Sequence, residues 1–305
     1  MISVFLFLYA ALLAGPLAWW LRRTEWPSRR PALGVVTWHV LALSVLGTVV
    51  LGAFAAAPSG HGDHHQHNHL LVAQACLLTV AFLGAAALCL GRGLLTYLRV
   101  DRGHRRQHRL LLSLAGRRDE RLGVVVVDHA TATAYCVPGP AGEVVLTSGA
   151  LAALDDRELA AVLAHERAHL RGRHHLVVAG AKVIRLAFPF VPVFRWAHDE
   201  VARLVELCAD DVAARRHGRS VLADALVTLA GTGGVPAAPP AALGAHGSTV
   251  TTRVNRLLGP AQLLGRWAVA GWLLALVALP AMPLLGAGPA LAGAADLLSH
   301  CPFPG

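Results

Sequence analysis

The sequence predicts a mainly α membrane protein with four transmembrane helices and a cytoplasmic α+β domain. Three observations support this fold class: a composition poor in charge, four long apolar runs, and a histidine–glutamate motif between the third and fourth runs. Of the 305 residues, 55% are hydrophobic and 15% are charged, whereas a soluble domain carries about 25% charged residues. The composition therefore argues against an ordinary soluble protein.

The four apolar runs are each close to the roughly 20 residues that a helix needs to cross the hydrocarbon core of a bilayer. They are Ile2–Leu21, Val35–Ala57, Leu70–Leu90 and Trp267–Leu285. No basic residue precedes the first run, and Arg22 and Arg23 follow it. We therefore interpret the first run as a retained anchor and not as a cleaved signal peptide.

Arginine placement predicts the orientation, because cytoplasmic loops carry an excess of Lys and Arg. Residues 22–30 hold four arginines and residues 92–109 hold six, but residues 58–69 hold no Lys or Arg. This pattern predicts that both termini lie outside and that the large loop after the third run is cytoplasmic. Lys182 is the single lysine in an Ala- and Gly-rich chain, which favours a GC-rich bacterial genome and hence an inner membrane.

The net charge of +9 allows two interpretations. It is compatible with nucleic-acid binding, but its juxtamembrane arginines are more simply explained by topology and by attraction to anionic lipid. We therefore expect the bilayer as a partner and no direct nucleic-acid contact. The five cysteines show no C-x-x-C spacing, so we expect neither a cysteine zinc site nor a disulfide framework.

The chain divides into three parts on this basis. Residues 1–91 hold three transmembrane helices and an external loop, residues 92–265 form the cytoplasmic domain, and residues 266–305 hold the fourth transmembrane helix and a short external tail. Gly233–Gly247 is rich in Pro, Ala and Gly and is typical of a linker.

Within the cytoplasmic domain, a basic helical segment should run through Arg121. Runs of β-branched residues predict a small antiparallel sheet, with strands at Gly123–Asp128, Ala132–Cys136 and Glu143–Thr147. We expect the last of these strands to lie at an edge beside the site, where a substrate could add as a further strand.

Two helices should follow the sheet. Asp155 or Asp156 can cap the first, which runs to His169, and the second should cover His198–His217. The apolar stretch Leu176–Ala197 between them is either a fifth span or a helix that lies against the bilayer or covers the site. We favour the latter, because a span would bury Lys182 and Arg185 in the membrane.

The motif on the first helix has the chemistry of a metal-dependent hydrolase. His165 and His169 are four residues apart, so both imidazoles lie on one helix face and can bind one zinc ion. Glu166 can take a proton from a water molecule as general base. The motif alone is short enough to arise by chance, in which case it would be a solvated helix face.

A third ligand separates these two interpretations. Glu206 and Asp210, again four residues apart, lie on the second predicted helix. Glu206 would complete a His₂Glu site, and Asp210 would accept a hydrogen bond from a ligand imidazole. Together the two motifs predict one catalytic zinc ion per chain, with a fourth position left open. His174 and His175 are then not needed as ligands.

These motifs and the order of the spans resemble the BlaR/MecR-type integral membrane zinc peptidases. The stretches V-V-L-T-S-G-A-L and L-A-A-V-L-A-H-E-R-A-H are also similar to HtpX and the CAAX prenyl proteases. The resemblance implies a zincin-type metalloprotease domain of the gluzincin class, with zinc on His165, His169 and Glu206 and with Glu166 as the catalyst. It further implies regulated cleavage of a DNA-binding repressor, possessing a winged helix, as the function.

The chain departs from these relatives at three points. An aspartate that many of them carry five residues after the second histidine is here His174. Only Leu176–Ala197 is available for the hydrophobic hairpins of HtpX-like enzymes. No penicillin-binding sensor domain follows the last span, so we do not expect covalent sensing of a β-lactam.

Two further features allow alternatives. The loop His61–His69 holds five histidines and an aspartate, which fits a metal or pH sensor or a polar loop that binds metal incidentally. Relatives carry an arginine before the last span that binds substrate or shapes the site. By this analogy Arg253 is a weak candidate for substrate or transition-state binding, and a lipid-facing arginine is the alternative.

The sequence thus predicts a membrane zinc endopeptidase, either a signalling protease that cuts a repressor or an HtpX-like quality-control protease. A metal transporter would need ligating residues within its spans, and these offer little beyond His39, Gln74 and two cysteines. A zinc-binding but inert receptor is disfavoured by the intact Glu166. The sequence does not predict the oligomeric state.

Overall fold

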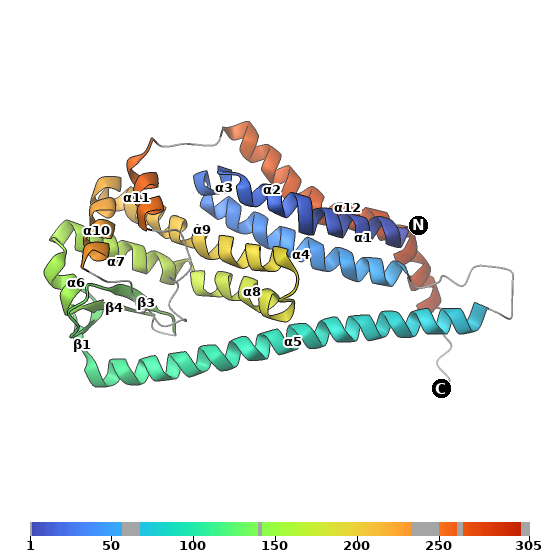
Figure 1. The fold of residues 1–305 in the computed structure, drawn as a ribbon, viewed down its shortest axis with the longest axis horizontal. Helices are drawn as coiled ribbons and strands as arrows, with labels where there is room; N and C mark the ends of the chain where they lie inside the picture. Colours follow the sequence, from blue (N-terminus) through green and yellow to red (C-terminus); the bar gives the residue numbers. More distant parts are fainter. Residues whose placement is uncertain (1, 57–67, 140–141, 233–249, 261–264, 300–305) are drawn as a thin grey trace.

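The computed structural model describes residues 2–56, 68–139, 142–232, 250–260 and 265–299 (Figure 1). Four of its helices are long and apolar enough to cross a membrane. They are Ile2–Arg23, Pro31–Ala55, Leu77–Gly103 and Trp267–Leu285. Three of these helices match the predicted apolar runs within four residues at each end, whereas the third begins seven and ends thirteen residues later than predicted. The four helices support a multi-pass membrane protein.

Three of the four apolar helices form a bundle (Figure 1). The first consists of α1 (Ile2–Leu12), a π-helical stretch (Leu13–Leu17) and α2 (Ala18–Arg23). Pro16 lies in the π-helical stretch, where its missing N–H interrupts the α-helical hydrogen bonds. The short α3 (Trp26–Arg29) leads into α4 (Pro31–Ala55), and α12 (Arg266–Ser299) packs against α4 and α1.

The third apolar run belongs to a much longer helix. The 48-residue α5 (Asn68–Ala115) continues without a break from the apolar run into the basic segment, so the predicted boundary after Gly91 lies inside a helix. The prediction of helix through Arg121 was wrong, because Gly116–Asp119 form strand β1. Gly116 sits close to the carbonyl of Leu112 and the side chain of Val125, where an added Cβ would clash.

The small sheet is mixed, and not antiparallel as predicted. It consists of β1 (Gly116–Asp119), β2 (Val124–Val127), β3 (Ala134–Val137) and β4 (Glu143–Thr147), in the order β1-β2-β4-β3. Strands β2 and β4 are parallel, and the two outer pairs are antiparallel. The prediction that Glu143–Thr147 is an edge strand was therefore wrong: β4 lies between β2 and β3, and the two edges are β1 and β3.

Six helices lie between the sheet and α12 in the described part of the chain. They are α6 (Ser148–Ala153), α7 (Asp156–Arg171), α8 (His174–Ala187), α9 (Pro192–His217), α10 (Arg219–Gly231) and α11 (Val250–Leu258). Asp155 caps α7, and Glu158 closes the capping box, which stabilises the start of the helix by satisfying three otherwise unpaired N–H groups. The cap fixes where α7 begins, and therefore which face carries His165 and His169.

The stretch Leu176–Ala197 is a helical hairpin and not one helix. Helix α8 ends at Ala187, a short turn follows, and α9 begins at Pro192, six residues earlier than predicted. Proline is well suited to the first turn of a helix, because the N–H that it lacks has no partner there. The hairpin lies between α4 and α5, with α9 against α4 and α8 against α5 (Figure 1).

Two apolar cores hold these layers together. In one core, buried side chains of α9, among them Val193, Phe194 and Leu204, pack on Trp38 and Leu41 of α4. A second core lies between the sheet and α7. Helix α9 therefore joins the membrane bundle to the helix that carries the H-E-x-x-H motif. Residues 58–67 of the histidine-rich loop and the linker Gly233–Gly247 lie outside the described residues.

Candidate metal centre

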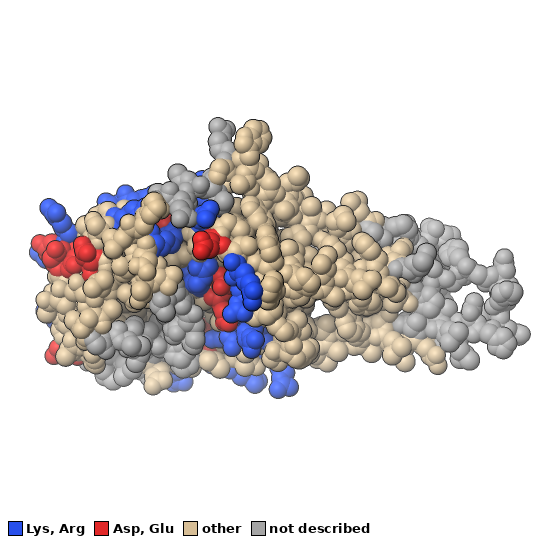
Figure 2. Space-filling view, turned by 45° about the horizontal axis from the view of Figure 1, so that its top comes forward, with Lys and Arg blue, Asp and Glu red and all other residues tan. Residues whose placement is uncertain are grey.

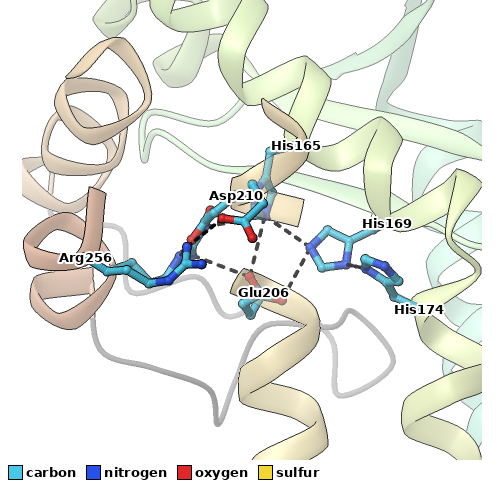
Figure 3. Close-up of polar contacts among 8 residues, drawn as sticks. His165, His169, His174, Glu206, Asp210 and Arg256 are labelled. Atoms are coloured by element: carbon cyan, nitrogen blue, oxygen red, sulfur yellow. Dashed lines mark hydrogen bonds and ion pairs between the residues drawn. The ribbon is translucent and has the colours of Figure 1, made fainter. Parts of the chain in front are cut away.

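The three predicted ligands converge where α7 crosses α9 (Figure 3). The Nε2 atoms of His165 and His169 lie 3.1 Å apart. Glu206 places Oε2 at 3.5 Å from the Nε2 of His165 and Oε1 at 3.4 Å from the Nε2 of His169. All three side chains are buried, and they form the one group of metal-ligating residues found among the described residues.

These distances fit a tetrahedral zinc ion. Ligand atoms bound at about 2.0–2.2 Å with tetrahedral angles lie about 3.3 Å from one another, close to the three observed separations. The donor set of two imidazoles and one carboxylate is that of catalytic zinc sites, which leave a fourth position for water or substrate. The residues therefore fit a zinc ion without rearrangement of the backbone.

His165 is held on its far side by a charged pair. Its Nδ1 lies 3.0 Å from Oδ1 of Asp210, and this carboxylate receives two hydrogen bonds from Arg253, from Nε at 2.9 Å and from Nη2 at 2.6 Å. Arg253 also lies 3.4 Å from Oε2 of Glu206. Burial opposes ionisation of Asp210, but the guanidinium of Arg253 holds its pKa well below the usual range.

His169 is held on its far side by a second imidazole. Its Nδ1 lies 3.0 Å from Nδ1 of His174, and the two rings meet edge to face with centroids 4.8 Å apart. When Nε2 of His169 serves as ligand, Nδ1 carries the proton and donates a hydrogen bond to Nδ1 of His174. His174 thus occupies the position of an acceptor, where a carboxylate serves for His165.

The turn between α7 and α8 brings His174 back onto His169. Arg173 has φ +48°, the only positive φ at a described non-glycine residue, and it reverses the chain before α8 starts. A Cβ added to Gly172 would lie 2.5 Å from Nε2 and 2.7 Å from Cδ2 of His174. The glycine therefore leaves the space that the His174 ring fills.

Glu166 lies beside the triad and faces the sheet. The thiol of Cys136 on β3 lies close enough to this carboxylate for the two groups to affect each other's pKa. Burial raises the pKa of Glu166, which the neighbouring His165 and Arg253 oppose. Burial also raises the pKa of the Cys136 thiol, so this cysteine is a neutral thiol and not a reactive thiolate. A carboxylate with a raised pKa is suited to accept and return a proton near neutral pH.

The two ligand histidines differ in protonation when no metal is bound. Burial disfavours the charged form of both, but hydrogen bonds to Asp210 and Glu206 raise the pKa of His165 to about 9. Burial lowers the pKa of His169 to about 3. The pKa of Glu206 is lowered to about 2, because His169, His165 and Arg253 outweigh the effect of burial. Glu206 is therefore ionised, as a metal ligand must be.

With both ligand imidazoles neutral, as metal binding requires, the charges of the centre sum to −2. Three carboxylates, Glu166, Glu206 and Asp210, surround one guanidinium, that of Arg253. Burying unbalanced charge is costly unless a partner neutralises it. A divalent cation on the triad would balance this charge.

Helix α11 ties the centre to the first loop of the membrane bundle. Arg256, one turn after Arg253, donates from Nη1 to Oδ1 of Asp211 at 2.8 Å and from Nε to the carbonyl of Ser28 at 3.0 Å. Arg203 on α9 donates to Oγ of Ser28 at 2.9 Å. The centre and α3 are therefore neighbours.

All the predicted site residues meet in this centre, including the weak candidate Arg253. The side chain of Arg253 is only 12% exposed. The alternative interpretation required this arginine to face lipid, and it does not. The contacts of His174, Cys136 and Arg256 were not predicted. None of these three contacts had a signal in the sequence, because each depends on the tertiary fold.

Comparison with known proteins supports a peptidase. Residues 98–201, about a third of the chain, match the model of peptidase family M48. This match supports a metallopeptidase of that family. With the four apolar helices, it supports a membrane-associated metallopeptidase. The matched range contains the H-E-x-x-H motif but ends before Glu206, and it does not single out the BlaR/MecR type. No curated protein and no solved structure gives a significant match to the chain.

Proposed function

We propose that the chain is a zinc-dependent membrane endopeptidase of the bacterial inner membrane, with its active site on the cytoplasmic side. The observation that carries the proposal is the spacing of the His165, His169 and Glu206 ligand atoms, with Glu166 next to the first of them. The match to peptidase family M48 supports the same reaction class, and the arginine-rich segments support the orientation.

The residues divide the work of peptide hydrolysis among them. His165, His169 and Glu206 would hold the zinc ion, which when bound acts as a Lewis acid and lowers the pKa of water to about 7. Glu166 takes the proton of the attacking water and delivers it to the leaving amine. Asp210 and His174 keep the two ligand imidazoles in the required tautomer. Arg253 fixes Asp210 and adds positive charge beside Glu206.

Strand β3 is the place where we expect a substrate to bind in extended form. It is the sheet edge nearest α7, and its Cys136 lies close enough to Glu166 for the carboxylate to raise the pKa of the thiol. Thr133 bonds across to Thr147, so by the alternation of antiparallel pairs the backbone groups of Ala134 and Cys136 point away from β4. A substrate strand could pair with these groups.

A proline at position 136 tests this binding mode. Cys136→Pro removes the edge N–H, while Cys136→Ala removes only the thiol. We expect the proline variant to raise the KM for peptide substrates at least tenfold more than the alanine variant. Equal KM values for the two variants would show that β3 does not bind the substrate.

Metal content and peptidase activity test the proposed function itself. We expect the purified protein to hold about one zinc ion per chain and to cut an unfolded protein. Glu166→Gln should keep the zinc and lose activity by a factor of at least about 100, and His169→Ala should lose both. Asp156→Asn, an exposed carboxylate on the same helix, is the matched control. Zinc retained in His169→Ala, or activity retained in Glu166→Gln, would contradict the proposal.

Cleavage of a cytoplasmic repressor with a winged helix remains our prediction from sequence for the physiological role, with turnover of membrane proteins as the alternative. Quantitative proteomics of the wild type against Glu166→Gln in the native host separates the two. One stabilised repressor would support signalling, and many stabilised membrane proteins would support quality control.

A further inference from the structure

Arg219, the first residue of α10, directs its side chain at main-chain oxygens. On the face drawn in Figure 2, many Lys and Arg side chains lie near Asp and Glu side chains, on the part of the molecule that holds the sheet. Exposed ion pairs contribute little to stability. Arg219 is instead partly buried, and three hydrogen bonds run from its guanidinium to backbone carbonyls. Its side chain therefore fixes a segment of backbone.

The segment that Arg219 fixes is the carbonyl end of α11. Nε of Arg219 donates to the carbonyl of Leu257 at 2.7 Å. Nη2 donates to the carbonyls of Arg256 at 2.6 Å and Gly259 at 2.8 Å. The last carbonyls of a helix have no partner inside it, and they form the negative end of the helix dipole. The guanidinium supplies both hydrogen-bond donors and positive charge at this end.

Helix α11 depends on contacts with the rest of the fold. It has nine residues, fewer than the roughly 12–15 that an isolated helix needs to be even marginally stable in water. Its Leu257 belongs to a buried cluster with Leu222 of α10 and Ala161 of α7, and this cluster anchors one face of the helix. Arg219 anchors its end. Together the two contacts fix α11 both across and along its axis.

The position of α11 decides how Arg253 meets the metal centre. Arg253 precedes Leu257 by four residues, which corresponds to about 6 Å along a helix with a rise of 1.5 Å per residue. Its guanidinium bonds to Asp210 at 2.6 and 2.9 Å and lies 3.4 Å from Glu206. A shift of α11 by about 1 Å away from α9 would stretch both bonds to Asp210 past the limit of about 3.5 Å. The contact therefore requires α11 to be held firmly.

We propose that Arg219 is a positioning residue of the metal centre: it holds the carbonyl end of α11 and thereby sets where Arg253 meets Asp210 and Glu206. The inference rests on the proposed zinc function and adds a residue that acts on the centre through another side chain. Asp210 orients His165, and Glu206 is itself a ligand, so a displaced Arg253 disturbs both. Loss of Arg219 should therefore weaken zinc binding without removing any group that contacts the metal.

Competition with a zinc chelator on the purified full-length protein tests the proposal. In Arg219→Gln we expect zinc affinity to fall about tenfold, the lower end of the range for groups that orient ligands. Arg219→Lys keeps the positive charge but not the planar fork of donors, and the fall should be about fivefold. If Arg219→Gln does not fold, the lysine variant provides the test. Arg216→Gln, at an exposed residue near the end of α9, is the matched control and should change nothing.

A double substitution shows whether the effect passes through Arg253. In the Arg253→Met background no guanidinium remains to be placed against Asp210, so Arg219→Gln should lower zinc affinity no further. Additive losses would overturn the positioning role, and so would an unchanged affinity in both single variants of Arg219. Either result leaves the peptidase function standing. A wild-type protein that binds no zinc would overturn the proposed function and this inference with it.

Hydrogen exchange of the zinc-free protein provides a readout that does not depend on the metal. Arg219→Gln should raise the exchange rates of the α11 amides about tenfold and leave those of α7 unchanged, because one helix can open without the rest of the fold. Equal increases in α11 and α7 would indicate a loss of global stability and would count against the proposal. Unchanged exchange in α11 would show that Arg219 does not hold the end of this helix.

Discussion

The two histidines of the proposed metal centre are supported by different chemistry. Behind His165 stands Asp210, a buried carboxylate at 3.0 Å that is itself held by Arg253. Behind His169 stands His174, an imidazole at 3.0 Å on a turn with a left-handed residue. The support of His165 is ionic and involves three helices. The support of His169 is neutral and lies five residues from it in the chain.

The two supports differ in what they stabilise: one contributes to folding and to metal binding, and the other mainly to metal binding. The Asp210–Arg253 pair orients His165 and also joins α11 to α9, so it contributes to folding as well as to metal binding. His174 makes a shorter-range contact that acts mainly on the tautomer of His169. Substitutions on the two sides should therefore differ in their effects on stability, although both should weaken metal binding.

The largest effect should follow from loss of the ionic support. In Asp210→Ala the guanidinium of Arg253 stays buried without its main partner, which destabilises a protein by about 3–5 kcal/mol. Loss of the acceptor for His165 should also weaken zinc binding by up to about 100-fold. Chemical denaturation and competition with a zinc chelator measure the two effects.

A neighbouring aspartate is the matched control for this prediction. Asp211 pairs with Arg256 at 2.8 Å, but its side chain is 31% exposed and is not in contact with a ligand. Asp211→Ala should leave zinc affinity unchanged. If Asp210→Ala does not fold, the double substitution Asp210→Ala/Arg253→Met should restore stability without restoring zinc affinity. Full zinc affinity in the double variant would refute an orienting role for Asp210.

A smaller effect should follow from loss of the neutral support. His174→Ala removes the acceptor for Nδ1 of His169, and we expect zinc affinity to fall by about tenfold with little change in the free energy of unfolding. His217→Ala, at the exposed end of α9, serves as control. A loss of stability as large as that of Asp210→Ala would show that the two supports do not differ in kind.

A carboxylate at position 174 should give His169 the same kind of hydrogen-bond acceptor that Asp210 provides for His165. Hydrogen bonds to an ionised acceptor are roughly twice as strong as those between neutral groups, so His174→Asp should tighten zinc binding by about fivefold relative to the wild type. Chelator competition at pH 7 measures the change. Weaker binding than in His174→Ala would indicate that the shape of the imidazole, and not its acceptor atom, supports His169.

The part of this centre that the sequence could predict is the part set by local geometry. The i, i+4 spacing placed His165 and His169 on one face, and the same spacing placed Glu206 near Asp210. The cap at Asp155 and the four apolar runs were also readable, because capping and hydropathy depend on neighbours in the chain. The structure agrees with each of these local features.

The parts that could not be predicted depend on contacts between distant segments. The parallel pairing of β2 with β4 is set by the fold and not by the β-branched runs themselves, and so the edge strand was misassigned. His174 reaches His169 only through the left-handed conformation of Arg173, a residue type that gives no signal for it. Arg253 meets Asp210 across 43 residues. The early start of α9, by contrast, had a readable signal in Pro192.

The smallest expected effect comes from Gly172, and it tests whether the position of His174 matters as well as its presence. A Cβ at residue 172 would lie 2.5 Å from the His174 ring, so in Gly172→Ala the ring must shift and its hydrogen bond to His169 lengthens. Zinc affinity should fall by about threefold, less than in His174→Ala.

The double substitution makes this last prediction specific to the contact. In the His174→Ala background no ring remains to be displaced, so Gly172→Ala should have no further effect on zinc affinity, and the two single effects should not add. Independent, additive losses would mean that Gly172→Ala acts through the backbone of the turn. In that case His169 would be held by the turn and not by the His174 ring, and the comparison with Asp210 would no longer apply.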